Sequence, residues 1–464
     1  MRRRAETTLA DAAAEACATA GREARRQWLA WTRTDTSEGD LFERLIGSPK
    51  ARFGYAIPAA ERAWAGRGQA ASVMAQGTRR FETAQERMAD VSARLWWGTD
   101  TGGGSSGSPL WVGGFAFDDA PSHGLWDAFP PACWWIPETL WTRTGELGHC
   151  TATVAVDPGD DPATTVERVE AAWAVASAPT PTACPSRAAE ALHLETARAA
   201  AEHRALVEAA LAAISRGELE KAVVARALDV EREAPIDVWK LTHELRHGHP
   251  ASATFWVGLG DSDFVGATPE RLLRREGSEI RAMALAGSAA RGRDPEEDGR
   301  LRRALVESKK EQAEHAVAVR ELRDALEDAG AEVDAPDSPG VLELGGVRHL
   351  HTPLRGHFES DASLFDVARR SHPTAAVSGA PRLASRAWLG EHEALERGWY
   401  AGLVGFTTPD GEGELSAALR CALVQDRRAR LFAGGGIVAG SDPDAELRET
   451  RLKWNVVLPL LLDL

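Results

Sequence analysis

Residues 402–438 read GLVGFTTPDGEGELSAALRCALVQDRRARLFAGGGIV, and this stretch decides the fold class. Its apolar and alternating segments predict strands at 402–407, 415–424 and 430–432. Further strands are predicted earlier in the chain, at 110–117, 221–226, 253–259, 264–268, 279–285 and 347–350. Runs of adjacent strands followed by helices are typical of α+β proteins with antiparallel sheets. We therefore expect the α+β class.

Three helices are predicted among these strands, at 188–216, at 294–329 and from about Ser441 onward. The second is amphipathic, with leucines on one stripe. Ser441 and Asp442 are candidate N-caps of the third, and Pro443 suits its first turn. The helices are expected to cover the sheets.

The first half of the chain is harder to interpret from periodicity. It begins with an Ala-rich charged stretch at 8–45, and a Gly/Ser loop at 101–109 leads into the glycine-containing strand at 110–117. A loose stretch with three prolines, 176–188, separates the halves. We place the boundary there, between a variable N-terminal half (1–188) and a catalytic region (189–464).

Composition limits the possible partners. With 54 Lys+Arg against 69 Asp+Glu, the formal charge is −15, which disfavours nucleic acid. An anionic ligand would need a local basic pocket. The five cysteines are scattered without a Cys-x-x-Cys pair, so neither disulfides nor a zinc site is expected. We find no signal peptide or membrane span and expect a cytoplasmic protein.

Two pairs of glutamates are the first candidates for chemistry. Glu311 and Glu314 lie three residues apart in a predicted helix, and Glu446 and Glu449 repeat this spacing with Lys453 four residues further on. Each pair can share one helix face. Mg²⁺ takes one or two carboxylates and completes its shell with water and substrate. The alternative is a solvated helix face with a neighbouring lysine, which is the commoner case.

Lys221 and Glu270 are candidates for acid and base chemistry. Lys221 begins an apolar strand, so its side chain can enter the interior, where a lysine can act as a base; alternatively it reaches solvent at the strand end. Glu270 follows a strand directly, at a place where side chains often project into a site. Its alternative is a helix first turn, favoured by the helix dipole.

The segment Gly434–Val438 and Arg420 are weaker signals. The glycines could let backbone amides approach an anion, but without a Lys-Ser/Thr or a dinucleotide pattern a hairpin turn is the default interpretation. Arg420 could present its guanidinium to a carboxylate, and an external salt bridge is about equally expected.

Taken in order, several segments resemble the chorismate-binding family, which includes isochorismate, salicylate, anthranilate and aminodeoxychorismate synthases. The similarity spans roughly 194–461, with a less specific part at 113–118. Its segments are Lys221-Ala-Val-Val-Ala-Arg226, Gly266-Ala-Thr-Pro-Glu-Arg-Leu272, Ala284-Leu-Ala-Gly-Ser288, Lys310-Glu-Gln-Ala-Glu-His315, His349-Leu350, His372-Pro-Thr374, Arg397-Gly-Trp-Tyr-Ala-Gly402, Gly434-Gly-Gly-Ile-Val438 and Glu446-Leu-Arg-Glu-Thr450 with Lys453.

The resemblance implies two large antiparallel sheets packed face to face, with helices outside and a site between the sheets. It implies that Glu314 and Glu449 hold Mg²⁺, with Glu311 and Glu446 in support through bound water. The metal would receive the ring carboxylate of chorismate.

The resemblance also implies roles around the substrate. Lys221 would be the general base for water attacking C2, and Glu270 the general acid for the departing C4 hydroxyl, on opposite faces of the ring. The residues implied to contact or surround chorismate are Ala286, Gly287, Ser288, His349, Ala376, Tyr400, Arg420, Gly434, Gly436 and Lys453.

Within the family the sequence is most similar to isochorismate synthases. Ala286 stands where aminodeoxychorismate synthases have a nucleophilic lysine, Ser288 where anthranilate synthases usually have threonine, and Ala376 where salicylate synthases tend to have threonine. Ala375 and Ser378 depart from the common His-Pro-Thr-Pro pattern and a common glycine. We expect no glutaminase subunit, and a product that enters menaquinone or siderophore biosynthesis. The alternatives are a salicylate or anthranilate synthase of this family, a non-catalytic binder of a chorismate-like ligand, and an unrelated metal hydrolase.

Overall fold

The structure is a computed structural model that describes residues 2–3, 8–48, 51–100, 108–176, 191–193, 196–344, 347–358 and 362–463. The glycines of the predicted loop at 101–109 lie outside these residues, and so do residues 177–188 of the proposed boundary stretch at 176–188.

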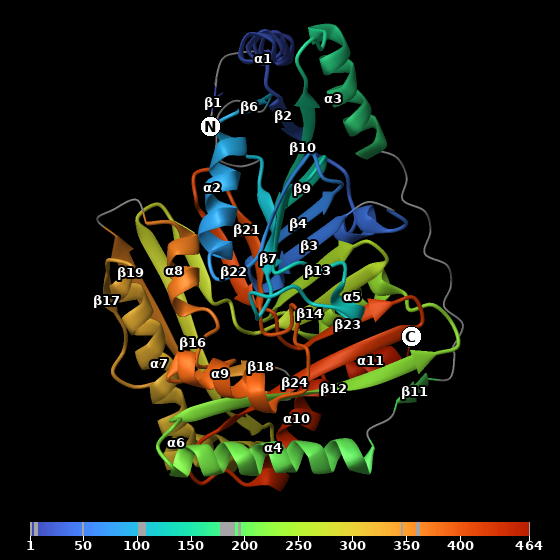
Figure 1. Cartoon of the computed structure of the whole chain (residues 1–464). Coiled ribbons are helices and arrows are strands. Elements are labelled where there is room, and N and C mark those ends of the chain that lie inside the picture. Colours follow the sequence, from blue (N-terminus) through green and yellow to red (C-terminus); the bar gives the residue numbers. More distant parts are fainter. Residues whose placement is uncertain are drawn as a thin grey trace.

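In the described parts of the chain, runs of strands are interspersed with helices (Figure 1). The strands are β1 (Arg2–Arg3), β2 (Gln27–Thr34), β3 (Arg52–Ile57), β4 (Arg62–Arg67), β5 (Ala71–Ala75), β6 (Leu95–Thr99), β7 (Trp111–Phe115), β8 (Ala132–Ile136), β9 (Thr139–Thr144), β10 (Leu147–Val156), β11 (Ala191–His193), β12 (Lys221–Arg232), β13 (Ala253–Leu259), β14 (Ser262–Thr268), β15 (Leu273–Glu276), β16 (Glu279–Ala290), β17 (Ala331–Asp334), β18 (Gly340–Leu344), β19 (Val347–Phe358), β20 (Gly379–Ala380), β21 (Leu403–Thr407), β22 (Gly413–Ala417), β23 (Cys421–Gln425) and β24 (Arg428–Ile437). The helices are α1 (Leu9–Glu23), α2 (Arg80–Ser92), α3 (Pro162–Ala176), α4 (Ala197–Ser215), α5 (Val238–Gly248), α6 (Pro295–Glu307), α7 (Lys309–Asp328), α8 (Leu364–Ser371), α9 (Arg382–His392), α10 (Pro443–Trp454) and α11 (Leu458–Asp463), with short 3-10 turns η1 (Leu41–Leu45), η2 (Pro58–Ala60) and η3 (Gly124–Trp126).

Two large sheets organise these elements, which confirms the predicted α+β class. Over the described residues, one sheet has fourteen strands in the order β1-β6-β2-β10-β9-β4-β3-β13-β14-β23-β24-β12-β11, with β20 on β12. The other has ten, in the order β17-β19-β16-β15-β22-β21-β7-β8-β5, with β18 on β19. Both sheets combine strands from either side of residue 188, through the pairs β3·β13 and β7·β21. The pairing is antiparallel except at β6, which lies parallel to β1 and β2.

The sheets pack face to face through aromatic side chains. Tyr55 and Trp64 of the large sheet contact Phe406 of the small one, with ring centroids 5.6 and 4.3 Å apart. The Tyr55 hydroxyl donates to Glu414 at 2.8 Å, so a buried polar contact also joins the two sheets. Burying these rings on both inner faces is the main hydrophobic gain that holds the layers together.

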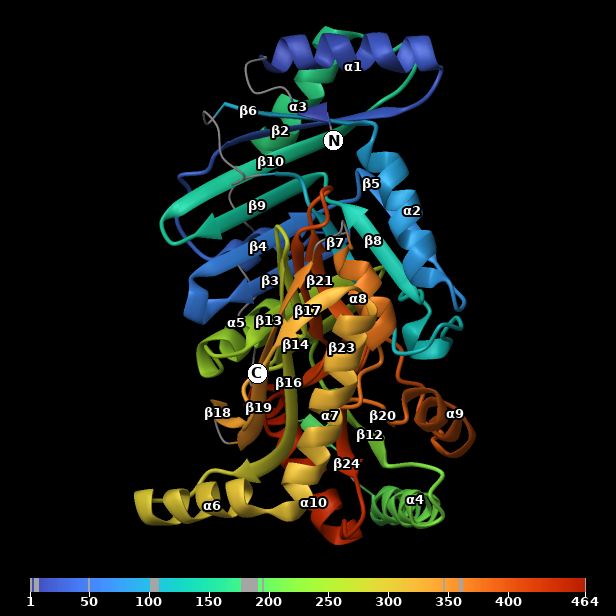
Figure 2. The same cartoon turned by 90° about the vertical axis from the view of Figure 1, so that its left-hand side faces the viewer.

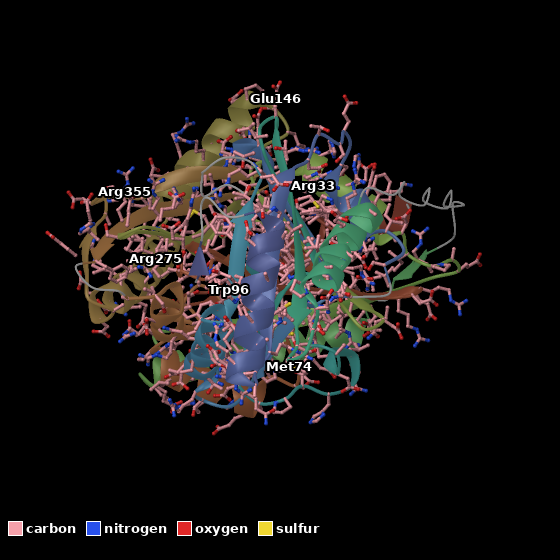
Figure 3. All side chains as sticks on the ribbon, turned by 90° about the horizontal axis from the view of Figure 1, so that it is seen from above. Arg33, Met74, Trp96, Glu146, Arg275 and Arg355 are labelled. Atoms are coloured by element: carbon pink, nitrogen blue, oxygen red, sulfur yellow. The ribbon has the colours of Figure 1, made fainter. Side chains whose placement is uncertain are left out.

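Helices cover the outer faces of this sandwich (Figure 2). On the small sheet α7 packs against β16, and α2 and α8 lie beside it; on the large sheet α10 packs against β24 and α4 against β12. At the far end of the molecule α1 and α3 lie side by side over β2 and β10, as the view from above shows (Figure 3). That end is built from residues before 177 and lies away from α7 and α10.

Glycines in the predicted strand at 110–117 bring backbones together. It is β7, and a Cβ on Gly113 would lie 2.0 Å from the carbonyl oxygen of Cys133 in the next strand. The four described cysteines, Cys17, Cys133, Cys150 and Cys421, are free and buried. No helix of the described part of the chain is long and apolar enough to cross a membrane.

Three predicted elements differ from the structure. The helix expected at 188–216 begins only at Ala197, because Thr196 caps it, and Ala191–His193 form β11 instead. The helix expected at 294–329 is two helices: Ser308 is extended and its hydroxyl accepts the N–H of Glu311, which ends α6 and caps α7. The strand expected at 415–424 is broken between β22 and β23, which belong to different sheets.

Candidate functional site

The site lies where four neighbouring strands of the large sheet reach the same end. Because antiparallel neighbours alternate in direction, the end of β14, the start of β23, the end of β24 and the start of β12 meet there. Glu270 follows β14, Arg420 precedes β23, Gly434 and Gly436 lie late in β24, and Lys221 begins β12. Topology therefore gathers residues that are far apart in the sequence.

Lys221 enters the interior at the start of β12. Its side chain is fully buried, and its Nζ lies 3.0 Å from Oε1 of Glu314 on α7, as an ion pair without an aligned hydrogen bond. Gly436 makes room for this pair, since a Cβ there would lie 2.1 Å from Glu314 Oε1 and 3.0 Å from Lys221 Cε. The alternative of a lysine that reaches solvent is therefore excluded.

The glycine segment is part of a strand rather than the predicted hairpin turn. Gly434, Gly435 and Gly436 pair with Ala225, Val224 and Val223 of β12. A Cβ on Gly434 would lie 3.0 Å from the Tyr400 hydroxyl. The absence of side chains keeps this inner face of the sheet open.

Gly436→Ala is expected to lower kcat at least tenfold with little loss of stability, because the methyl group would displace Glu314 from Lys221. Steady-state kinetics and thermal unfolding would measure the two effects. Gly390→Ala is the control, since a Cβ on Gly390 of α9 meets nothing within 4 Å. Normal kcat in Gly436→Ala would show that the Lys221–Glu314 contact is dispensable.

Glu270 lies in the loop between β14 and β15, so its alternative as a helix first-turn residue is wrong. Its carboxyl is 2% exposed, and Oε1 has no hydrogen-bond partner. Burial raises the pKa of Glu270 to about 8, against the opposing charges of Lys221 and Arg420. Glu270 is thus held protonated at neutral pH, beside two cationic groups.

A bulge in β16 of the small sheet forms the facing wall. Its register shifts between Ala286 and Ser288, and Gly287 adopts a φ of +79°, which favours glycine. The bulge points the Ser288 N–H at Glu311 Oε2, 2.9 Å away. The Ser288 hydroxyl lies 2.8 Å from His349 Nδ1 on β19.

Arg420 reaches the site from the crossover between the two sheets. Its backbone is left-handed, with a φ of +51°, a strained conformation for a residue with a Cβ. Its Nη2 lies 3.3 Å from His349 Nε2. Burial, together with the charge of Arg420, lowers the pKa of His349 to about 3, so the imidazole is neutral and accepts from Arg420. Arg420 is therefore directed into the site and is not an external salt bridge.

The two glutamate pairs face each other from α7 and α10. Lys310 Nζ bridges them, 2.7 Å from Glu446 Oε1 and 3.4 Å from Glu311 Oε1. Lys453 Nζ lies 2.7 Å from Glu449 Oε1 and also donates to the Gly434 carbonyl. These contacts exclude the alternative of two solvated helix faces.

Burial and mutual repulsion set the charge state of this cluster. Burial, with Glu449 nearby, raises the pKa of Glu446 to about 6, while burial and Glu314 raise that of Glu311. For Glu449 burial acts in the same direction, but Lys453 and Lys310 outweigh it and lower its pKa. Burial opposes the charge of Lys310, yet the carboxylates outweigh it and raise its pKa. The cluster therefore needs cations to remain ionised.

The donor set fits a hard cation. Glu446 is 1% exposed, and its Oε2 has no hydrogen-bond partner. In the described part of the chain no three His, Cys, Asp or Glu side chains surround one point closely enough to hold a metal by themselves. Carboxylate oxygens are the ligands that Mg²⁺ prefers, and it takes only one or two carboxylates from a protein.

These groups surround a cavity of about 640 Å³, including its mouth. It is lined by all the residues implied to contact or surround the substrate, together with Glu270, Glu314 and Glu449. Lys221, Glu311 and Glu446 lie behind its wall. The sequence missed further lining residues, which are Val223, Pro269, Leu285, Val377, Leu419, Phe432 and Ala433. These are apolar or small and carry no signal of their own in a single sequence.

Sequence prediction also missed the position of Lys310. Lys310 directly precedes Glu311, and adjacent side chains on a helix are not expected to share a face, so the spacing did not predict their contact. Its partner Glu446 is on another helix, so spacing along the chain could not reveal the contact.

The chain is similar to several known proteins over most of its length. A sequence model of the family described as "Chorismate binding enzyme" matches residues 15–462. The salicylate biosynthesis isochorismate synthase of Pseudomonas aeruginosa is 34% identical over 351 residues, 75% of this chain and 74% of that protein. Isochorismate synthase MenF of Bacillus subtilis is 32% identical over 361 residues, 77% of this chain and 75% of that protein.

The fold is also that of a solved structure. The menaquinone-specific isochorismate synthase MenF of Escherichia coli matches with a TM-score of 0.76 over 96% of this chain and all of that chain. Its sequence identity is 23%, so this likeness concerns the fold alone.

Proposed function

This chain belongs to the chorismate-binding enzyme family, and we propose that it is an isochorismate synthase, which converts chorismate to isochorismate with Mg²⁺. The observation that carries the proposal is a cavity lined by a buried carboxylic acid, Glu270, whose pKa is about 8, with the buried amine of Lys221 directly behind its wall. A substitution with allylic shift needs one group that takes a proton and another that gives one.

In the proposed reaction Lys221 acts as a free amine and takes a proton from a water molecule as the water oxygen bonds to C2. The ring double bonds shift, the C4–oxygen bond breaks, and Glu270 protonates the departing hydroxyl. One water is consumed and one is released, so the product is an isomer of the substrate. No step needs an oxidant or a second substrate.

The remaining residues bind and orient the dianion. Arg420 and Lys453 present cationic groups to the cavity. Neutral His349, oriented by Ser288 and Arg420, would lie beside the ring. A magnesium ion held by Glu314 and Glu449, with Glu311 and Glu446 in support through bound water, would neutralise the ring carboxylate.

Water is the proposed nucleophile because Ala286, in the wall of the cavity, offers no amine. Ser288 also lines the cavity, where anthranilate synthases, which use ammonia from a glutaminase, usually have threonine, and we therefore propose that no glutaminase subunit takes part. Ala376 lines the cavity as well, where salicylate synthases tend to carry threonine. We propose that the isochorismate feeds menaquinone or siderophore biosynthesis.

The test is to incubate the purified protein with chorismate and Mg²⁺ and to resolve isochorismate, salicylate, anthranilate and pyruvate. We expect isochorismate with little pyruvate, and at least a hundredfold lower rate after chelation of Mg²⁺ by EDTA. Added ammonium should give no anthranilate. Pyruvate formed in step with chorismate loss would reassign the protein to the lyases of the family. Tight binding of chorismate without any conversion would make it a binder.

A further inference from the structure

Lys310 is a cation that the proposed reaction does not use. It lies in the first turn of α7, and its ammonium group spans the gap to α10, where it contacts Glu446 and Glu311. It is not part of the cavity lining, unlike Lys453. Its ion-pair partners are the supporting carboxylates of the proposed metal site, Glu446 and Glu311.

A charge count over the cluster shows what Lys310 contributes. Glu314 is paired with Lys221, Glu449 with Lys453, and Glu446 with Lys310. Glu311 accepts the N–H of Ser288. With Lys221 counted as the free amine that the proposed reaction requires, four carboxylates against the two ammonium groups of Lys310 and Lys453 leave two negative charges, and without Lys310 they leave three.

We propose that Lys310 is a built-in counter-cation: it neutralises the supporting carboxylates, keeps Mg²⁺ weakly bound without substrate, and so couples tight metal binding to arrival of the dianion. This inference rests on the proposed function. With Lys310 present, the cluster plus one dication is neutral. Without it the same assembly carries one negative charge, which repels a dianion. Lys310 is thus a positioning residue that acts through Glu446 and Glu311.

The prediction is a pair of opposite shifts. Removing the Lys310 charge should tighten metal binding in the absence of substrate by tenfold or more, and should raise the KM for chorismate at saturating metal. General damage to the site would instead weaken both metal binding and chorismate binding. The full-length protein would be titrated with Mn²⁺, followed by its electron paramagnetic resonance signal, and with Mg²⁺ by calorimetry.

The variants are Lys310→Met and Lys310→Gln, which remove the charge, and Lys310→Arg, which keeps it and should bind Mn²⁺ as the wild type does. Lys309→Met is the matched control, because Lys309 is the preceding residue on the same helix and is exposed. It removes the same charge from the chain without touching the cluster.

The outcomes separate this inference from the proposed function. Mn²⁺ affinity that is unchanged or weaker in both neutral variants, but abolished by Glu449→Gln, would overturn the role of Lys310 and leave the metal site standing. Mn²⁺ binding that Glu449→Gln does not affect would overturn the metal site and this inference with it.

Discussion

Lys221→Ala is expected to lower kcat by about 10²–10⁴-fold, the usual contribution of a general base. The variant removes the buried amine that we propose takes the proton from water. The KM for chorismate should change much less, because Lys453 and Arg420, which face the cavity, remain in place. Steady-state kinetics with isochorismate as the measured product would test this.

The control for Lys221→Ala has to separate base chemistry from the ion pair with Glu314. Lys221→Arg carries a positive charge there, but its guanidinium group stays protonated near neutral pH and so cannot accept a proton from water. If it stays inactive, charge alone is insufficient. Small primary amines added to Lys221→Ala should restore part of the rate, more so for more basic amines. Near-normal turnover in either variant would refute the role of Lys221 as base.

The sequence predicted the parts of this site that depend on local pattern. The spacing of Glu311 and Glu314, and of Glu446 and Glu449, correctly placed each pair on one helix face. The helix N-caps were predicted in part: Asp442 caps α10 as expected, because its side chain accepts the N–H of Ala445. These features are predictable because they involve residues within four positions of one another.

The parts that were missed depend on contacts between distant segments. Ser308 interrupts an otherwise continuous amphipathic pattern, and apolar periodicity does not register a single extended residue. Arg420 sits where an alternating stretch crosses from one sheet to the other, and alternation alone predicts one unbroken strand. Gly434 and Gly436 looked like a turn, since the need for space arises only from Tyr400 and Glu314 across the cavity.

Two of these misses, Arg420 and Gly436, lie beside the buried charged groups of the cavity. Charged groups from both sheets and from two helices lie close together there. The cost of burying each charge is offset by a neighbouring group of opposite charge or by a hydrogen bond. Left-handed backbone at Arg420 and side-chain-free strand at Gly436 are the structural costs of that arrangement. Such local departures from regular structure are expected at functional sites and are poorly visible in local sequence.

Glu270→Gln should separate activity from stability, because the two are expected to move in opposite directions. The amide cannot donate the proton that leaves with the C4 oxygen, so kcat should fall by about 10²–10⁴-fold. In the wild type the acid works only while protonated, below its pKa of about 8. The wild-type kcat/KM should therefore decline tenfold per pH unit above about pH 8. The residual kcat/KM of Glu270→Gln should not show this alkaline decline.

The stability prediction follows from the same pKa. Folding raises the pKa of Glu270 from 4.5 to about 8, so the folded state must retain a proton that the unfolded chain loses. Its contribution to wild-type stability is complete below pH 4.5 and is lost progressively up to pH 8, by about 1.4 kcal/mol per pH unit. Glu270→Gln avoids this loss, so its unfolding free energy relative to wild type should rise between pH 5 and pH 8. Denaturant unfolding at both values would measure it, and a difference that does not change with pH would mean that Glu270 is not held protonated by burial.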